Sequence, residues 1–165
     1  MPQLTRRAGT AAALAAGLSG CVTPHQAATG PDTATLILST GTEPASVQAF
    51  ADRQCGVHPQ GTRLAYFFRD RFDPPTGVTR TVQAGRELVF TFRLNRHTGT
   101  TLQICEATRA FVPQAGRRYR AHFEEAPGGC LLMLSELESP PGEAPRERPM
   151  EADVVVPACF DGGRG

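Results

Sequence analysis

The chain has 165 residues, of which 17 are basic and 16 acidic, so its formal charge is +1. A chain this close to neutrality has no electrostatic reason to bind nucleic acid, because that binding depends on neutralising phosphates. The length fits one domain of ordinary size, which buries about two-thirds of the surface that the unfolded chain exposes.

The first twenty residues have the three parts of a secretory signal peptide. Met1–Arg7 ends in two arginines, Ala8–Leu18 is small and apolar without a charge, and two small residues precede Cys21. An apolar run this short cannot span a bilayer as a helix, which needs roughly 20 residues. We therefore expect residues 1–20 to direct export and to be removed.

The sequence Leu18-Ser19-Gly20-Cys21 resembles the lipobox of bacterial lipoproteins, which has leucine, two small residues and an obligatory cysteine. The resemblance implies cleavage between Gly20 and Cys21 and a diacylglycerol thioether on the Cys21 thiol, so membrane lipid would be a partner. Val22 follows the cysteine in place of aspartate. By resemblance to enterobacterial sorting, this favours the periplasmic side of the outer membrane over the inner membrane. An ordinary secretory signal with a chance cysteine is the alternative.

Four further cysteines are expected to form two disulfides, because exported chains usually pair an even number of thiols. They are Cys55, Cys105, Cys130 and Cys159. Three connectivities are open, and we expect Cys55–Cys105 together with Cys130–Cys159. A metal site would show close pairs such as Cys-x-x-Cys, which these spacings lack, so we expect no metal.

The chain beyond residue 33 has the pattern of short β-strands. The clearest is 86–94, where alternate apolar side chains fall on one face, with the period of two of a half-buried strand. Residues 46–52 also fit a helix, yet an isolated two-turn helix is marginal, so a strand is favoured. Leu64, Tyr66 and Phe68 are expected on a core face, and residues 131–134, apolar on both faces, in a central strand. The remaining candidates are 33–39, 78–82, 102–106, 118–123 and 153–157.

Seven to nine short strands separated by Gly/Pro turns predict an all-β fold. We expect a single antiparallel β-sandwich of immunoglobulin or transthyretin type over residues 34–160. Residues 21–33 would be the lipidated cysteine and a flexible tether, and residues 161–165 a disordered tail. Residues 138–150 contain four prolines, which exclude a central strand and predict an exposed, mobile loop.

Residues 111–119 contain the pattern Phe-x-Pro-x-x-Gly-x-x-Tyr, with a cysteine on either side at positions 105 and 130. This segment resembles an element of small exported β-sandwich lipoproteins, where it joins two strands. The resemblance implies a fold and no activity. Phe111 is expected to plug the end of the core, Gly116 to accommodate the strain of the turn, and Tyr119 to re-enter the core as a half-polar anchor.

Residue types that act in catalysis or metal binding in other proteins form no recognised catalytic or metal-binding pattern in this sequence. The histidines have no shared ligand spacing, and no serine lies in a Gly-x-Ser-x-Gly elbow. The carboxylate pairs and the only basic cluster are expected to be solvated faces, so we expect no catalytic residue, cofactor or metal site. The residues in question are His25, His58, His97, His122, Glu124, Glu125, Glu136, Glu138, Arg117, Arg118 and Arg120.

The expected function is that of a membrane-anchored envelope lipoprotein with a non-catalytic binding, assembly or structural role. Its partners would be membrane lipid and an envelope protein, with no nucleic acid. One alternative is a subunit of a secretion or surface complex, which would expose a large apolar patch. Another is a periplasmic enzyme or enzyme inhibitor, which would bring Ser, His or carboxylate side chains together in a concave site.

Overall fold

The computed structural model describes residues 24–50, 53, 61–68, 72–140, 144 and 146–154. The signal segment 1–20 and the tail 161–165 lie outside the described residues, as do Cys21, Cys55, His58 and Cys159. The described part of the chain contains no apolar helix long enough to cross a membrane.

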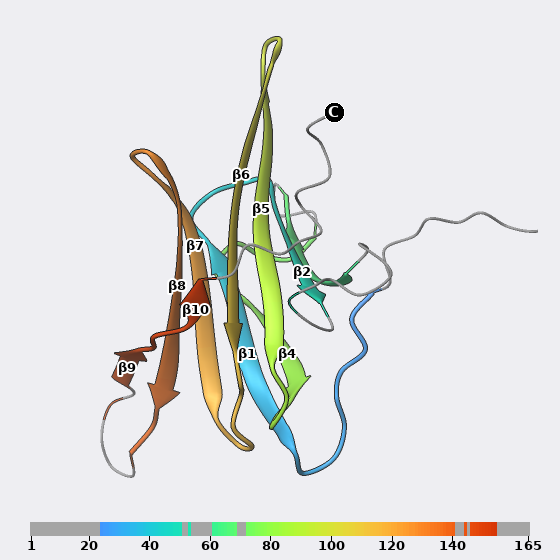
Figure 1. Ribbon diagram of the computed structural model, residues 1–165, viewed down its shortest axis with the longest axis vertical. Helices are drawn as coiled ribbons and strands as arrows, with labels where there is room; N and C mark the ends of the chain where they lie inside the picture. The colour runs from blue at the N-terminus through green and yellow to red at the C-terminus, as the bar shows by residue number, and fades with distance from the viewer. Residues whose placement is uncertain are drawn as a thin grey trace, which may run out of the picture.

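The fold is all-β, and the strands within the described residues form two five-stranded sheets (Figure 1). The strands are β1 (Thr33–Thr40), β2 (Ala45–Phe50), β3 (Thr62–Phe67), β4 (Val78–Gln83), β5 (Leu88–Thr98), β6 (Thr101–Phe111), β7 (Arg118–Ala126), β8 (Gly129–Glu138), β9 (Arg146–Pro149) and β10 (Asp153–Val154). The first sheet has the order β4-β1-β7-β8-β9 and the second β10-β6-β5-β2-β3. Strands β1 and β7 run parallel, so the first sheet departs from the purely antiparallel arrangement that we expected.

One apolar core lies between the two sheets, an arrangement consistent with a β-sandwich. The core face expected in 86–94 is confirmed, because Phe90, Phe92 and Leu94 of β5 are fully buried in this core. The strand is not half-buried, however, since Val89 and Thr91 on its other face are buried as well. Phe92 stacks on Phe123 of the first sheet with ring centroids 5.3 Å apart. Offset aromatic pairs add about 0.5–1.5 kcal/mol to the free energy gained from apolar burial. The strand expected at 46–52 is confirmed as β2.

Strand β3 places different side chains in the core from those expected. Leu64 is buried, but Phe67 occupies the core, while Tyr66 and Phe68 are only half-buried. The prediction for Tyr66 and Phe68 was wrong because the pairing of β2 with β3 shifts by one residue after Val47. Such a shift moves every following side chain to the other face of the strand.

Strands β8 and β9 differ from what the sequence predicted for residues 131–134 and 138–150. In β8, Leu132 and Leu134 enter the core, but Leu131 and Met133 on the other face are 40% and 41% exposed. The strand lies next to the edge of its sheet and not at its centre. Part of the Pro-rich segment 138–150 forms the edge strand β9, all of it exposed. An edge tolerates proline, which cannot donate a backbone hydrogen bond.

The turn between β6 and β7 has the predicted construction. Phe111 is 7% exposed and packs edge-on against Tyr119, with ring centroids 5.0 Å apart. Gly116 has a φ of 73°, a left-handed conformation that side chains other than glycine adopt at a cost. The Tyr119 hydroxyl accepts a hydrogen bond from the Gln114 amide at 3.0 Å, which satisfies its polar end.

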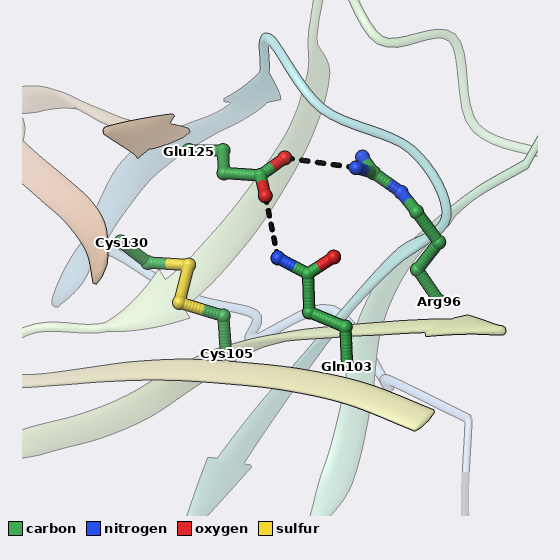
Figure 2. The surroundings of a disulfide bond; sticks show 5 residues. All are labelled: Arg96, Gln103, Cys105, Glu125 and Cys130. Atoms are coloured by element: carbon green, nitrogen blue, oxygen red, sulfur yellow. Dashed lines mark hydrogen bonds and ion pairs between the residues drawn. A yellow bond between two sulfur atoms is a disulfide. The ribbon is translucent and has the colours of Figure 1, made fainter. Parts of the chain in front are cut away.

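A disulfide joins Cys105 of β6 to Cys130 of β8 and so connects the second sheet to the first (Figure 2). The expected pairing of Cys55 with Cys105 and of Cys130 with Cys159 is therefore wrong. Strands β6 and β8 contact each other across the core, and Cys105 packs against that core, so its thiol meets a cysteine of the facing sheet. Of the three connectivities, the one that contains this bond pairs Cys55 with Cys159.

Polar contacts beside the disulfide join the two hairpins that extend beyond it. Glu125 of β7 accepts a hydrogen bond from Gln103 at 2.7 Å and pairs with Arg96 at 3.0 Å (Figure 2). Figure 1 shows the β5–β6 hairpin rising well above the rest of the molecule. The disulfide and the Glu125 contacts fix the inner side of this hairpin to the β7–β8 hairpin.

Residues 24–28, expected to belong to the flexible tether, lie against the edges of both sheets. The His25 amide donates to the Arg63 carbonyl of β3 at 3.1 Å. The Ala28 amide donates to the Thr81 carbonyl of β4 at 3.2 Å, and the His25 ring nitrogen Nε2 also bonds that carbonyl, at 3.0 Å. This segment therefore connects edge strand β3 of the second sheet to edge strand β4 of the first.

Candidate functional site

The largest hollow described in the molecule is a trough of about 1030 Å³ on the outer face of the first sheet. The register of β1, β7 and β8 determines which side chains form its floor. Ser39, His122 and Met133 lie side by side on β1, β7 and β8. Arg120 and Ser135 form a parallel row two residues along. Neighbouring side chains on one sheet face contact each other across strands, so the pleat alone brings these residues together.

Loops and an edge strand form the walls of this trough. On one side lie Gly41 and the segment Pro75–Thr76, and on the other Pro149 of β9. The loop after β1 is held in place because the Thr40 amide donates to the Pro75 carbonyl at 3.0 Å. The Gly41 amide donates to the Phe123 carbonyl at 2.8 Å. The walls are thus tied to the sheet by backbone hydrogen bonds.

A hydroxyl and an imidazole meet on the floor of the trough. Ser39 Oγ lies 2.9 Å from His122 Nδ1, and His122 Nε2 lies 3.9 Å from a Glu124 carboxylate oxygen. Ser39 is only 6% exposed, so the imidazole covers its hydroxyl. His122 lies on the outer face of β7, and its contact with Ser39 was not predicted from the sequence. The parallel register of β1 and β7, which creates that contact, joins residues 83 positions apart.

The backbone around Ser39 decides what this pair can do chemically. Acyl transfer needs donors aimed at the developing oxyanion, commonly backbone amides next to the nucleophile. The two amides that follow Ser39, those of Thr40 and Gly41, both donate to carbonyls. The Glu124 oxygen at 3.9 Å is beyond hydrogen-bond distance of the imidazole. Neither of these two amides is therefore free to donate to an oxyanion, and the Ser39 hydroxyl is already hydrogen-bonded to His122.

A charged pair forms the far side of the floor. Arg120 of β7 pairs with Glu147 of β9, and the Ser135 hydroxyl donates to the same carboxylate at 3.3 Å. Met133 is the register partner of His122 on β8, so it continues the row of the Ser39–His122 contact and lies beside the row of Arg120 and Ser135. The trough therefore presents an apolar side chain beside two polar groups, with the prolines of the walls around them.

The other residues considered from the sequence are dispersed. His25 lies on the edge of β4, and His97 lies within β5. Arg117 pairs with Glu136, apart from Arg120. No group of three or more His, Cys, Asp or Glu side chains able to hold a metal ion occurs among the described residues.

The Glu136 and Glu138 pair does not form the solvated face that was expected. Glu136 is 6% exposed, with Arg117 at 3.3 Å and Arg148 in contact, and Glu138 bonds Arg148 at 3.0 Å. Glu136 and then Glu138 raise the pKa of the Arg148 guanidinium above its ordinary value. Arg148 belongs to β9, so these contacts attach the edge strand that forms one wall of the trough.

Comparison of the sequence with protein-family models and with curated proteins, and of the fold with solved structures, finds no match. The site must therefore be interpreted from its own geometry. That geometry is an open trough whose floor holds a Ser39–His122 hydrogen bond, the Met133 side chain next to it and an Arg120–Glu147 ion pair.

Proposed function

We propose that this chain is a lipid-anchored envelope protein whose two-sheet domain binds a ligand or partner segment in the trough without transforming it. The trough is the observation that supports this proposal. Binding sites are typically concave and largely apolar, with a few placed polar groups that fix orientation. Met133, Pro75 and Pro149 provide the apolar surface, while His122 and Arg120 provide hydrogen-bonding groups. The ligand would have an apolar body and polar groups spaced to meet both rows.

The proposed location rests on two independent features. The N-terminal segment ends in Leu18-Ser19-Gly20-Cys21, which resembles a lipobox. The Cys105–Cys130 disulfide fits an oxidising compartment such as the periplasm or the cell surface. Acylation at Cys21 with two or more chains would give stable anchoring, at about 0.8 kcal/mol for each buried CH₂ group. The residue after Cys21 favours the outer membrane.

We also propose that the domain is of the immunoglobulin or transthyretin type. Support comes from Tyr119, whose hydroxyl accepts a hydrogen bond from the backbone five residues upstream at the start of β7. Immunoglobulin-type sandwiches have a tyrosine corner of this kind. A disulfide between the sheets is a second shared feature, although here it joins β6 and β8 near the turn of the β7–β8 hairpin.

Anchoring is tested by replacing Cys21 with Ala and fractionating the cells. The wild-type chain should pellet with membranes, and the variant should appear in the soluble periplasmic fraction, because no lipid then holds it. Equal partitioning of both chains into the membrane would exclude Cys21 as the anchor.

Binding is tested by comparing Met133→Asp with Leu131→Asp. Both side chains lie on the outer face of β8 and are 41% and 40% exposed, but only Met133 lines the trough. Ligands that co-purify with the wild-type protein from envelope extracts should be lost with Met133→Asp and kept with Leu131→Asp. Equal loss with both variants would exclude the trough as the binding site.

A hydrolytic role is the second candidate, because Ser39 Oγ and His122 Nδ1 are 2.9 Å apart. The amides of Thr40 and Gly41 argue against it, since both already donate to carbonyls and neither is free to donate to an oxyanion. The Ser39→Ala variant separates the two roles. A binding site loses one hydrogen bond, worth about 0.5–1.5 kcal/mol, whereas a hydrolase loses its activity on generic ester substrates.

A further inference from the structure

An exposed aromatic cluster lies at the edge of the second sheet. Tyr66 and Phe72 meet edge-on with ring centroids 5.0 Å apart, and Tyr66 and Phe68 stack at 6.1 Å. Phe72 is 62% exposed, the second most exposed large apolar side chain in the described part of the chain. Tyr66, Phe68 and Phe72 are called the aromatic edge below.

Hydrogen bonds fix Phe72 in this exposed position. The Asp73 amide donates to the Tyr66 carbonyl at 3.0 Å, and the Tyr66 amide donates to the Asp73 carboxylate at 2.9 Å. Asp73 also pairs with Arg80 of β4 at 3.0 Å. The backbone that carries Phe72 is therefore tied to both edge strands, and its ring is presented outward in spite of the cost of leaving it in water.

The N-terminal segment passes the aromatic edge. Pro24 and His25 line the same hollow of about 520 Å³ as Tyr66 and Phe72. Cys21 precedes Pro24 by three residues, and three residues span at most about 11 Å. Because residues 24–28 bond to β3 and β4, an acyl chain on Cys21 must enter the membrane close to this edge.

The charge beside the aromatic edge suits a membrane surface. Arg63 of β3 is exposed, and no carboxylate in the described part of the chain pairs with it. The charge of Arg80 is matched by Asp73, so of the two arginines in β3 and β4, Arg63 is the one whose charge is available to a headgroup phosphate. Aromatic side chains with a polar end, such as Tyr66, are enriched at the level of the headgroups.

We propose that the aromatic edge and Arg63 rest in the headgroup region of the bilayer that holds the Cys21 acyl chains. This inference depends on the proposed lipid anchor and adds a second contact to it. The domain then lies with β3 and β4 against the membrane. The opposite edges, β9 and β10, point away from the membrane (Figure 1). The trough opens sideways, where a ligand in the periplasm reaches it.

The chain has no tryptophan, so one introduced tryptophan is a specific reporter. Phe72→Trp places it in the aromatic edge. Val154→Trp is the matched control, because Val154 is 75% exposed in β10, on the opposite edge of the same sheet. Each lipidated variant is reconstituted into phosphatidylethanolamine–phosphatidylglycerol vesicles, with and without bromine at the upper positions of the acyl chains. Flotation of the vesicles measures anchoring separately.

The proposal predicts that the indole emission of Phe72→Trp shifts to the blue relative to the same variant with Cys21→Ser. It also predicts that brominated lipid quenches most of the Phe72→Trp emission and leaves the Val154→Trp emission unchanged. If both variants float and Phe72→Trp is quenched no more than Val154→Trp, the aromatic edge does not contact the bilayer, although the anchor stands. If neither variant floats with the vesicles, the lipid anchor itself is refuted and this inference fails with it.

Discussion

At the scale of single residues, the outer face of the second sheet contains a buried hydroxyl pair. Thr91 of β5 and Thr108 of β6 are register partners, 2% and 5% exposed, with their hydroxyl oxygens 2.7 Å apart. Each hydroxyl satisfies the other. A buried hydroxyl that loses its partner costs about 1–3 kcal/mol, whereas replacing both partners by apolar groups of the same shape is nearly neutral.

We therefore predict that Thr91→Val or Thr108→Val alone lowers the free energy of unfolding by about 1–3 kcal/mol. The double variant should recover most of that loss, since valine preserves shape and strand preference. Urea unfolding of the four chains gives the coupling energy directly. Additive losses in the double variant would show that the two hydroxyls do not depend on each other.

Arg109 is a second residue whose position has an energetic consequence. It lies opposite Phe90 on the core side of β6, and its guanidinium donates to the Thr108 carbonyl at 3.0 Å. Burial lowers the pKa of this guanidinium, and no carboxylate in the described part of the chain pairs with it. The charge is thus partly desolvated without the compensation that an ion pair provides.

Replacing Arg109 with Met keeps the apolar stem and removes the charge. We predict that the free energy of unfolding stays unchanged or rises by about 1 kcal/mol. Arg93→Met is the control. It breaks a partly exposed ion pair with Glu106, 2.8 Å long, and should lose at most about 1 kcal/mol. A larger loss for Arg109→Met than for Arg93→Met in urea unfolding contradicts the interpretation.

At the scale of elements, the Cys105–Cys130 bond stabilises the pair of long hairpins. It closes a loop with a sequence separation of 25 residues. Chain-entropy arithmetic for such a loop gives about 3.5 kcal/mol. Replacing both cysteines with serine should lower the free energy of unfolding by that amount and raise the rate of hydrogen exchange in the outer parts of β5 and β6.

Peptide mapping without reductant should show Cys55 bonded to Cys159. A map in which Cys55 bonds Cys105 contradicts the connectivity.

The elements also show how far local patterns specify the fold. The alternation of apolar residues correctly predicted the position of β5 and its core residues. The pattern from Phe111 to Tyr119 correctly predicted the turn between β6 and β7. Both predictions succeeded because these features depend on residues that are close in the sequence. Tyr66 and Phe68 were misplaced because a shift in the pairing of β2 and β3 decides their face. The disulfide and the Ser39–His122 contact depend on which strands lie opposite or side by side. That choice is made by the whole sheet and leaves no local signal in the sequence.

At the scale of the whole molecule, residues 24–28 close the side of the two sheets where edge strands β3 and β4 meet. Three hydrogen bonds hold the segment, two from amides and one from the His25 ring. Edge strands with unpaired backbone groups are templates for association with other chains. The segment therefore covers part of both edges and protects the domain from such association.

We predict that a chain beginning at Thr29 is less stable than one beginning at Val22, both without lipid. Three hydrogen bonds at about 0.5–1.5 kcal/mol each give a loss near 3 kcal/mol in the free energy of unfolding. The shorter chain should also self-associate through β3 and β4, which light scattering detects as a mass that rises with concentration. His25→Ala in the longer chain removes the ring contact alone, so its loss should be about a third as large. If the chain from Thr29 stays monomeric and as stable as the longer one, residues 24–28 are a passive tether after all, and the membrane distance argued from them no longer holds.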